Sequence, residues 1–74
     1  MSKQSLKDYI ITKLTERGDT DITVTNIRTV SKDVLMADVS YTWRLHGWKK
    51  RAEHKDSLFV YKDDKWHSPL LMCT

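Results

Sequence analysis

The chain has 74 residues, of which 13 are Lys or Arg and 10 are Asp or Glu, and its net charge is +3. A chain of this length fits one domain, residues 1–74, and buries only about 60% of its unfolded surface, so we expect marginal stability that dimerisation would supplement. No segment approaches the roughly 20 apolar residues that cross a bilayer, and no apolar signal peptide opens the chain, so we expect no membrane-spanning segment.

The first predicted element is a helix over residues 5–17, SLKDYIITKLTER. Leu6, Tyr9, Ile10 and Leu14 recur at helical spacing and form one apolar stripe, which is typical of an amphipathic helix. Gly18 follows and can adopt the left-handed conformation that commonly ends a helix. The stripe needs an apolar surface to pack on, which the rest of the chain must supply.

The second predicted element is a strand over residues 21–30, DITVTNIRTV. Ile22 and Val24 alternate with threonines, and this composition suits a half-exposed strand. Ile27 and Val30 break the alternation, which indicates a β-bulge.

A long β-hairpin follows, and its turn predicts which residues pair. Residues 34–45 alternate throughout, His46-Gly47 offers a two-residue turn, and a second long strand runs from Trp48 to about Tyr61. Closure by two residues predicts that Leu45 opposes Trp48, Trp43 opposes Lys50, Tyr41 opposes Ala52, Val39 opposes His54 and Asp38 opposes Lys55.

The last predicted strand opens at Trp66, after a polar turn at residues 62–65, KDDK. Pro69 lacks a backbone donor, so this strand should lie at a sheet edge or end near it. The element order therefore predicts an α+β fold, with one N-terminal helix packed on a curved four-stranded antiparallel β-meander.

The two faces of the hairpin differ in character. The pairing above puts one apolar set on the face toward the helix: Ala37, Val39, Tyr41, Trp43, Leu45, Trp48, Ala52 and Leu58. Thr42, Arg44, Lys49 and Arg51 stand on the opposite face. We expect Tyr41 and Trp43 in the core, whereas the position of Trp48, beside the turn and near Lys50, stays open.

Beyond Asp56 both faces of the long return strand are apolar. Leu58 and Val60 alternate with Phe59 and Tyr61, and Trp66 would join the second set. One helix cannot cover two faces. Either a bulge near residues 55–57 rotates the strand, or the outer face meets another molecule. The sequence leaves both interpretations open.

The sequence gives little support to a metal site or to a catalytic site. His46, His54 and His67 have no cysteine or carboxylate at a ligand spacing such as HxxxH, so we expect no metal and no cofactor. The predicted pairing places His54 and Asp56 inward on one face, where they would line a pocket as acid and base, but an inward histidine is more often structural. We therefore expect a protein that is not an enzyme.

The order of elements resembles the final sheet of nuclear-transport-factor-like and cystatin-like domains. The resemblance covers roughly residues 22–67 and rests on VTNIRTVSKDVLMADVSYTWRLHG, the long return strand and FVYKDDKWH. It implies a curved sheet and non-catalytic binding through the open sheet face, often in dimers. The chain has length for one helix only, so a lidded pocket is not implied. The hairpin tip RLHGW lacks Gln-x-Val-x-Gly, so protease inhibition is not implied.

The leading functional hypothesis is a protein-binding module, a small adaptor or inhibitor, that is homodimeric through its outer sheet face. Phe59, Tyr61 and Trp66 would form the contact, with Arg44 at the rim. The single cysteine, Cys73, has no partner for an intrachain disulfide, which favours the cytoplasm.

The alternative hypothesis is nucleic-acid binding through the basic hairpin, because five basic residues and one acidic residue give it a net charge of +4 between positions 44 and 55. The residues that would contact phosphates and bases are Arg44, Trp48, Lys49, Arg51 and Lys55. Their aromatic and basic members mostly face opposite sides of the sheet, which disfavours a stacking platform for bases.

Overall fold

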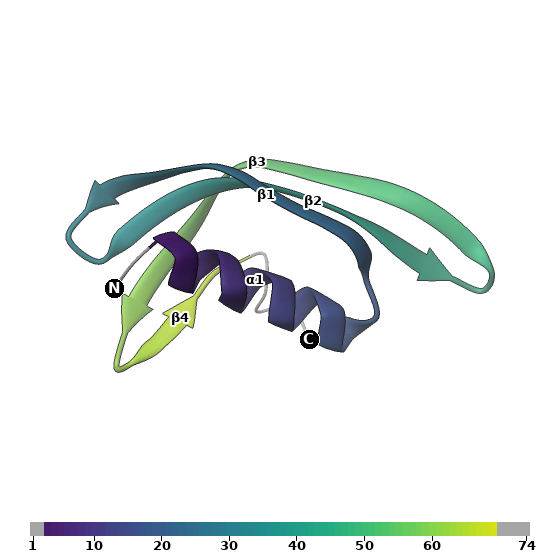
Figure 1. Cartoon of the computed structure of the whole chain (residues 1–74), viewed down its shortest axis with the longest axis horizontal. Helices are drawn as coiled ribbons and strands as arrows, with labels where there is room; N and C mark the ends of the chain where they lie inside the picture. The colour runs from purple at the N-terminus through teal and green to yellow at the C-terminus, as the bar shows by residue number, and fades with distance from the viewer. Residues whose placement is uncertain (1–2, 70–74) are drawn as a thin grey trace.

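The computed structural model describes residues 3–69 and confirms the predicted fold class. Helix α1 spans Lys3–Arg17, and strands β1 (Thr20–Ser31), β2 (Val34–Leu45), β3 (Trp48–Lys62) and β4 (Lys65–His67) follow in chain order. All neighbouring strands pair antiparallel in the order β1-β2-β3-β4. Figure 1 shows the sheet curling over the helix, which lies on the concave side.

Helix α1 ends as the sequence predicts, at a glycine. Gly18 has φ +99°, and its backbone N–H donates to the carbonyl of Thr15 at 3.0 Å, while that of Asp19 donates to the carbonyl of Leu14 at 2.9 Å. This pair of bonds is a Schellman motif, which satisfies the last carbonyls of the helix and turns the chain sharply into β1. Among residues 3–69, no helix has the length and apolarity to cross a membrane.

The core lies between α1 and the concave face of the sheet. Leu6, Ile10 and Leu14 are fully buried, as the helical stripe predicts. They meet seven buried side chains of the four strands: Val24, Leu35, Ala37, Val39, Tyr41, Phe59 and Trp66. A single helix thus fills the concavity of the sheet.

The predicted hairpin pairing is confirmed near the turn and shifts farther away. The pairs from Leu45 with Trp48 to Val39 with His54 are those expected. Between Ala37 and Val39 the register then moves by one residue, so that Ala37 opposes Ser57 and Asp38 is not directly paired with Lys55. Asp56 has φ 56° at this point, so β3 carries a bulge there. The bulge that the sequence left open is therefore present.

The shift reverses the predicted faces of the second half of β3. Phe59 is 0% exposed in the core and Leu58 is 39% exposed, so the expectation that Leu58 faces the helix and Phe59 faces outward is wrong. Trp66 also lies inward, against Tyr61 with ring centroids 5.0 Å apart and against Tyr9 at 6.4 Å. An outward face made of Phe59, Tyr61 and Trp66 does not exist in one subunit, because one extra residue rotated it into the core.

We predict opposite outcomes for two adjacent substitutions on β3. Phe59→Ala removes a fully buried ring, so the free energy of unfolding should fall by about 3–5 kcal/mol, whereas Leu58→Ala on the outer face should change it by less than about 1 kcal/mol. Urea unfolding followed by circular dichroism measures both. If Phe59→Ala fails to fold, Phe59→Leu should still fold with a loss of about 1 kcal/mol. A larger loss at Leu58 than at Phe59 would contradict the bulge.

Candidate functional site

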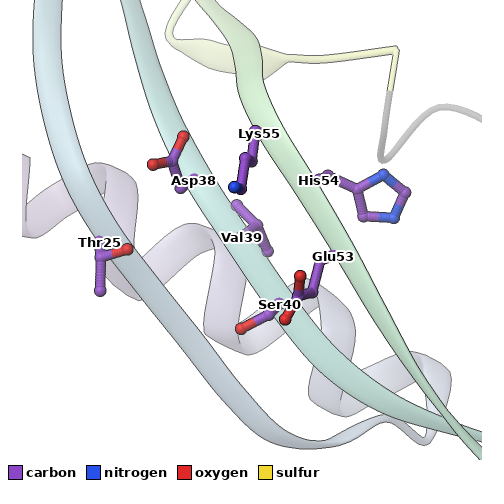
Figure 2. Close-up of a pocket in the computed structure, with 7 residues that line it drawn as sticks. All are labelled: Thr25, Asp38, Val39, Ser40, Glu53, His54 and Lys55. Atoms are coloured by element: carbon purple, nitrogen blue, oxygen red, sulfur yellow. The ribbon is translucent and has the colours of Figure 1, made fainter.

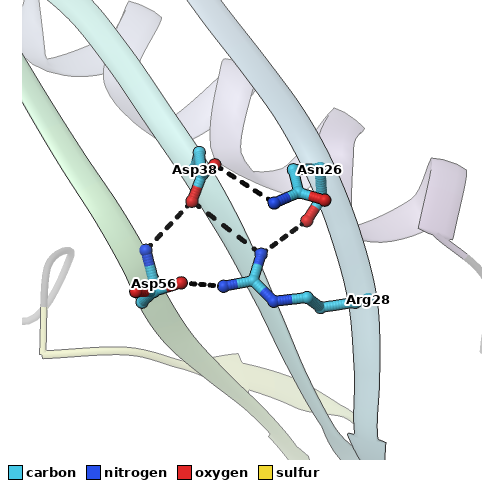
Figure 3. Close-up of polar contacts among 4 residues, drawn as sticks. All are labelled: Asn26, Arg28, Asp38 and Asp56. Atoms are coloured by element: carbon cyan, nitrogen blue, oxygen red, sulfur yellow. Dashed lines mark hydrogen bonds and ion pairs between the residues drawn. The ribbon is translucent and has the colours of Figure 1, made fainter.

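The convex face of the sheet carries a polar network around the carboxylate of Asp38 on β2. The backbone N–H of Asp56 on β3 donates to Asp38 Oδ1 at 3.0 Å, and Asn26 Nδ2 on β1 donates to Asp38 Oδ2 at 3.3 Å. Arg28 on β1 lies between them: its Nη1 is 3.8 Å from Asp38 Oδ1 and donates to the carbonyl of Asn26 at 2.7 Å, and its Nη2 pairs with the Asp56 carboxylate. Figure 3 shows this carboxylate between the two neighbouring strands.

The network sits where both neighbours of β2 are irregular. Asn26 has φ 53° and lies in the shift between Thr25 and Arg28 on β1, just as Asp56 lies in the shift on β3. Asn and Asp enter the left-handed region at lower cost than other residues with a Cβ. One carboxylate therefore links two bulges on opposite sides of the central strand, at the place where the sheet bends.

The same contacts set the charge state of Asp38. The hydrogen bond from the backbone of Asp56 is the largest cause that holds the pKa of this carboxyl below its ordinary value of 3.8. Partial desolvation opposes this shift, while the Asn26 amide and the charges of Arg28 and Lys55 add to it. Asp38 is thus ionised at neutral pH and acts as a fixed acceptor.

Next to this network the convex face has a shallow hollow of about 290 Å³. Its lining comes from three strands around the bulges: Thr25, Asp38, Val39, Ser40, Glu53, His54 and Lys55. Figure 2 shows Ser40 and Glu53 close together over β2 and β3, while the His54 ring lies beyond β3, away from Asp38. Acidic and basic groups are mixed here, so the hollow presents no single charge to a ligand.

The β2–β3 hairpin extends past the helix and forms an arm (residues 43–50). A helix of 15 residues spans roughly 22 Å and a strand of 12 residues roughly 40 Å, so α1 cannot cover the whole of β2. The pairing of β1 with β2 stops at Thr20 with Thr42, so β1 does not reach the arm either. Figure 1 shows the hairpin continuing beyond the C-terminal end of α1.

The concave side of the arm is an uncovered apolar groove. Trp43 is half-buried, Leu45 is 55% exposed and Trp48 is 71% exposed. With His46 and Lys50 they line a space of about 410 Å³. The register puts these side chains on the face that α1 covers farther along, so the groove continues the core surface into solvent. The expectation that Tyr41 and Trp43 lie in the core is confirmed for Tyr41, whereas Trp43 is on the expected face but only half-buried at the edge of the core. The open question of Trp48 is answered by its exposure.

A polar cluster closes the core where the arm begins. The hydroxyl of Tyr41 lies 3.1 Å from His54 Nε2, and the two rings stack with centroids 5.6 Å apart. The guanidinium of Arg17, at the end of α1, lies 5.1 Å from the Tyr41 ring and pairs with Asp19 at 2.8 Å. These contacts account for the inward histidine as a structural residue.

The predicted acid–base pair is not assembled. His54 faces the concave side and bonds Tyr41, whereas Asp56 is exposed on the convex side and pairs with Arg28. The expectation that Asp56 points inward beside His54 is therefore wrong, because the bulge turns it over. Within residues 3–69, no three His, Cys, Asp or Glu side chains come together as metal ligands.

The predicted nucleic-acid residues divide between the two faces, as expected. Lys49 pairs with Arg44 and Arg51 with Thr42 on the convex side, while Trp48 pairs with Leu45 on the concave side. Arg51 bends back over β2: its guanidinium donates to the carbonyl of Asp21 at 2.6 Å and to the hydroxyls of Thr42 at 3.2 Å and Ser40 at 2.9 Å. These hydrogen bonds link β3 to β1 and β2, and they hold the guanidinium of Arg51 against the sheet.

Sequence analysis missed the network of Asn26, Arg28 and Asp38. The sequence feature that could have predicted it is the presence of Asn26 and Asp56 in two long strands. Asn and Asp are residue types that tolerate positive φ, and both residues lie where their strand is irregular. The sequence did not predict the groove as one surface, although the lengths of the helix and of the strands already imply that the helix leaves one end of the hairpin uncovered.

Comparison with known proteins supplies no relative. No protein-family model, no curated protein and no solved structure matches this chain. The resemblance to nuclear-transport-factor-like and cystatin-like domains therefore stays a prediction, and any functional argument rests on the geometry above.

We predict that Asp38→Asn lowers stability in a pH-dependent way. Folding lowers the pKa of Asp38, so its ionised form stabilises the fold above about pH 4, and this contribution disappears as the pH falls through the lowered pKa. Urea unfolding should find the wild type more stable than the variant at about pH 7, with a difference that shrinks toward zero as the pH falls through the lowered pKa of Asp38.

Asp63→Asn is the matched control for that series, since it makes the same change of charge in an exposed turn residue that also has positive φ. Its stability should follow the wild type at each pH. A difference between Asp38→Asn and the wild type that stays constant from neutral pH into acid would contradict a charge-based role for Asp38.

Proposed function

We propose that the chain is a non-enzymatic protein-binding module whose contact surface is the groove on the concave side of the hairpin arm. The observation that supports this most strongly is the exposure of Trp48, at 71%, next to Leu45 at 55%. This surface replaces the outer face of Phe59, Tyr61 and Trp66, since two of those three side chains are buried in the core.

Clustering distinguishes this surface from ordinary exposure. Single exposed apolar residues are common on any protein, and Val30, also 55% exposed, is such a case. At the arm, two indoles and a leucine line one groove of about 410 Å³. Tryptophan is among the residues that most often dominate binding energy, because it buries a large rigid surface. The groove therefore has the composition of a contact centre.

The surroundings of the groove favour an acidic partner. Lys50 lies within it, and none of its other lining residues is acidic. Charges at the rim of an apolar contact mainly speed association and select partners. We propose a partner segment with large apolar side chains flanked by Asp or Glu.

Nucleic-acid binding is the weaker proposal for the same arm. Bases stack on exposed aromatic rings while phosphates meet cations on the same surface. Here Trp48 shares its face with Lys50, but Arg44, Lys49 and Arg51 stand on the opposite face, and Arg51 is held by Ser40 and Thr42. The separation of rings from cations favours a protein partner.

We propose the cytoplasm as the compartment. The sequence holds one cysteine, so no intrachain disulfide is available to a small domain that would profit from one in an oxidising compartment. The fold is instead held by its core and by the polar contacts of Asp38, Tyr41 and Arg17.

Selection of short displayed peptides on the immobilised chain tests the proposed function. Wild type should enrich peptides with large apolar residues flanked by acidic ones, and calorimetry with a synthesised winner should find that Trp48→Ala weakens binding by about tenfold or more. The same variant should alter the free energy of unfolding by only about 0.5 kcal/mol, because the ring is exposed.

Val30→Ala serves as the control, since it removes an equally exposed apolar side chain far from the turn at His46-Gly47 and should bind as the wild type does. Peptide binding that survives Trp48→Ala would refute the groove. Tight binding of single-stranded or duplex oligonucleotides that falls steeply with salt and is lost in Lys49→Gln would replace this proposal with nucleic-acid binding.

A further inference from the structure

The outer edge of β3 is open over its first half. β3 pairs with β2 on one side from Trp48 onward, whereas β4 pairs on the other side only with Val60, Tyr61 and Lys62. Within residues 3–69, no strand pairs with residues 48–56 on that side. A long unpaired edge is a template for another strand unless it is blocked.

The turn fixes which backbone groups face that edge. In a hairpin closed by two residues, the flanking pair, here Leu45 and Trp48, exchanges the first hydrogen bonds of the ladder. The N–H and C=O groups then alternate, so those of Trp48, Lys50 and Ala52 face β2. Those of Lys49, Arg51 and Glu53 face the open edge, and their side chains share the convex face.

From this edge we propose that a second copy of the chain pairs antiparallel with the first, β3 against β3, on a two-fold axis through Arg51. In this register Lys49 of each copy stands opposite Glu53 of the other, so two pairs of opposite charge form across the contact. Neither Lys49 nor Glu53 has an ion pair or side-chain hydrogen bond within residues 3–69 that this contact would break.

The axis places Arg51 opposite its own copy, and the structure relieves the repulsion. The guanidinium of Arg51 is drawn across β2 to Ser40, Thr42 and the carbonyl of Asp21, away from the open edge. The two neighbouring registers place more like charges opposite each other. An axis through Lys50 would oppose Lys49 with Arg51 twice and form no pair of opposite charge. An axis through Ala52 would pair Arg51 with Glu53 twice, but it would also oppose Lys49 with Lys55 twice, and the guanidinium of Arg51 is already held by Ser40 and Thr42.

The side chains on the concave face of the proposed contact are also compatible with this register. The axis through Arg51 brings Trp48 of one copy opposite His54 of the other and Lys50 opposite Ala52. The exposed indole of Trp48 thereby gains a neighbour at the edge of the partner's core, beside the stacked pair of Tyr41 and His54. The two sheets would join into one sheet of eight strands with both helices on its concave side.

This inference is independent of the proposed partner groove, because it rests on the edge of β3 and on two charges of the convex face. Sedimentation velocity over a concentration series at low salt tests it. Wild type should show a concentration-dependent dimer, and Lys49→Glu and Glu53→Lys should each weaken its dissociation constant by about tenfold, since each places like charges opposite each other twice.

Mixing the two variants gives the most specific test of the proposed register. A chain with Lys49→Glu offers two acidic residues at positions where a chain with Glu53→Lys offers two basic ones, so an equimolar mixture should dimerise at least as well as the wild type. In addition, the amide signals of Lys49, Arg51 and Glu53 should change with concentration more than those of Lys50 and Ala52, which face β2.

Two results would overturn the inference. One is a chain that stays monomeric at every concentration. The other is a dimer that both charge variants form as the wild type does and that mixing leaves unchanged, which would place the contact elsewhere, such as on the groove of Trp48. Peptide binding is judged by its loss in Trp48→Ala, whereas the edge dimer is judged by the two charge variants and their mixture, so failure here and failure of the proposed function are told apart.

Discussion

The carboxylate of Asp38 is the constraint on which the rest of the fold depends. It accepts hydrogen bonds from Asn26 on one neighbouring strand and from the backbone of Asp56 on the other, at the two points where those strands carry an extra residue. A bulge increases local twist, and two bulges facing one central residue bend the sheet across its full width. The bend makes the concavity that α1 fills (Figure 1). The shift in β3 brings Phe59 into it.

Much of this arrangement was predictable from periodicity and turn chemistry. Alternation along residues 34–45 and the His46-Gly47 turn were enough to pair Leu45 with Trp48 and Val39 with His54. The faces beyond Asp56 were not, because alternation cannot locate a residue that leaves the ladder, and no glycine marks the place. The uncovered groove depends on the unequal rise of helix and strand, which the sequence does contain, but the exposure of Trp48 follows only once both elements are placed.

The boundary between core and arm has its own chemistry. On the core side Tyr41 and His54 stack on each other, and the guanidinium of Arg17 lies over the Tyr41 ring. Beyond them the same face continues as Trp43 and Trp48 without a helix above it. The hydroxyl of Tyr41, the imidazole of His54 and the guanidinium of Arg17 thus form one set of polar contacts between the buried core and the groove.

The short connection between α1 and β1 has a consequence for how such a protein changes over time. Only Gly18 and Asp19 separate the helix from the strand, and the Schellman bonds with Leu14 and Thr15 leave this link no slack. The helix is tethered at one place along the sheet and cannot slide toward the hairpin tip. Insertion of residues at this joint, with no substitution in the core, would let the helix lie at another place along the sheet. Such an insertion is therefore the smallest change, in evolution or in design, that would cover the aromatic side chains of the hairpin tip or leave more of them uncovered.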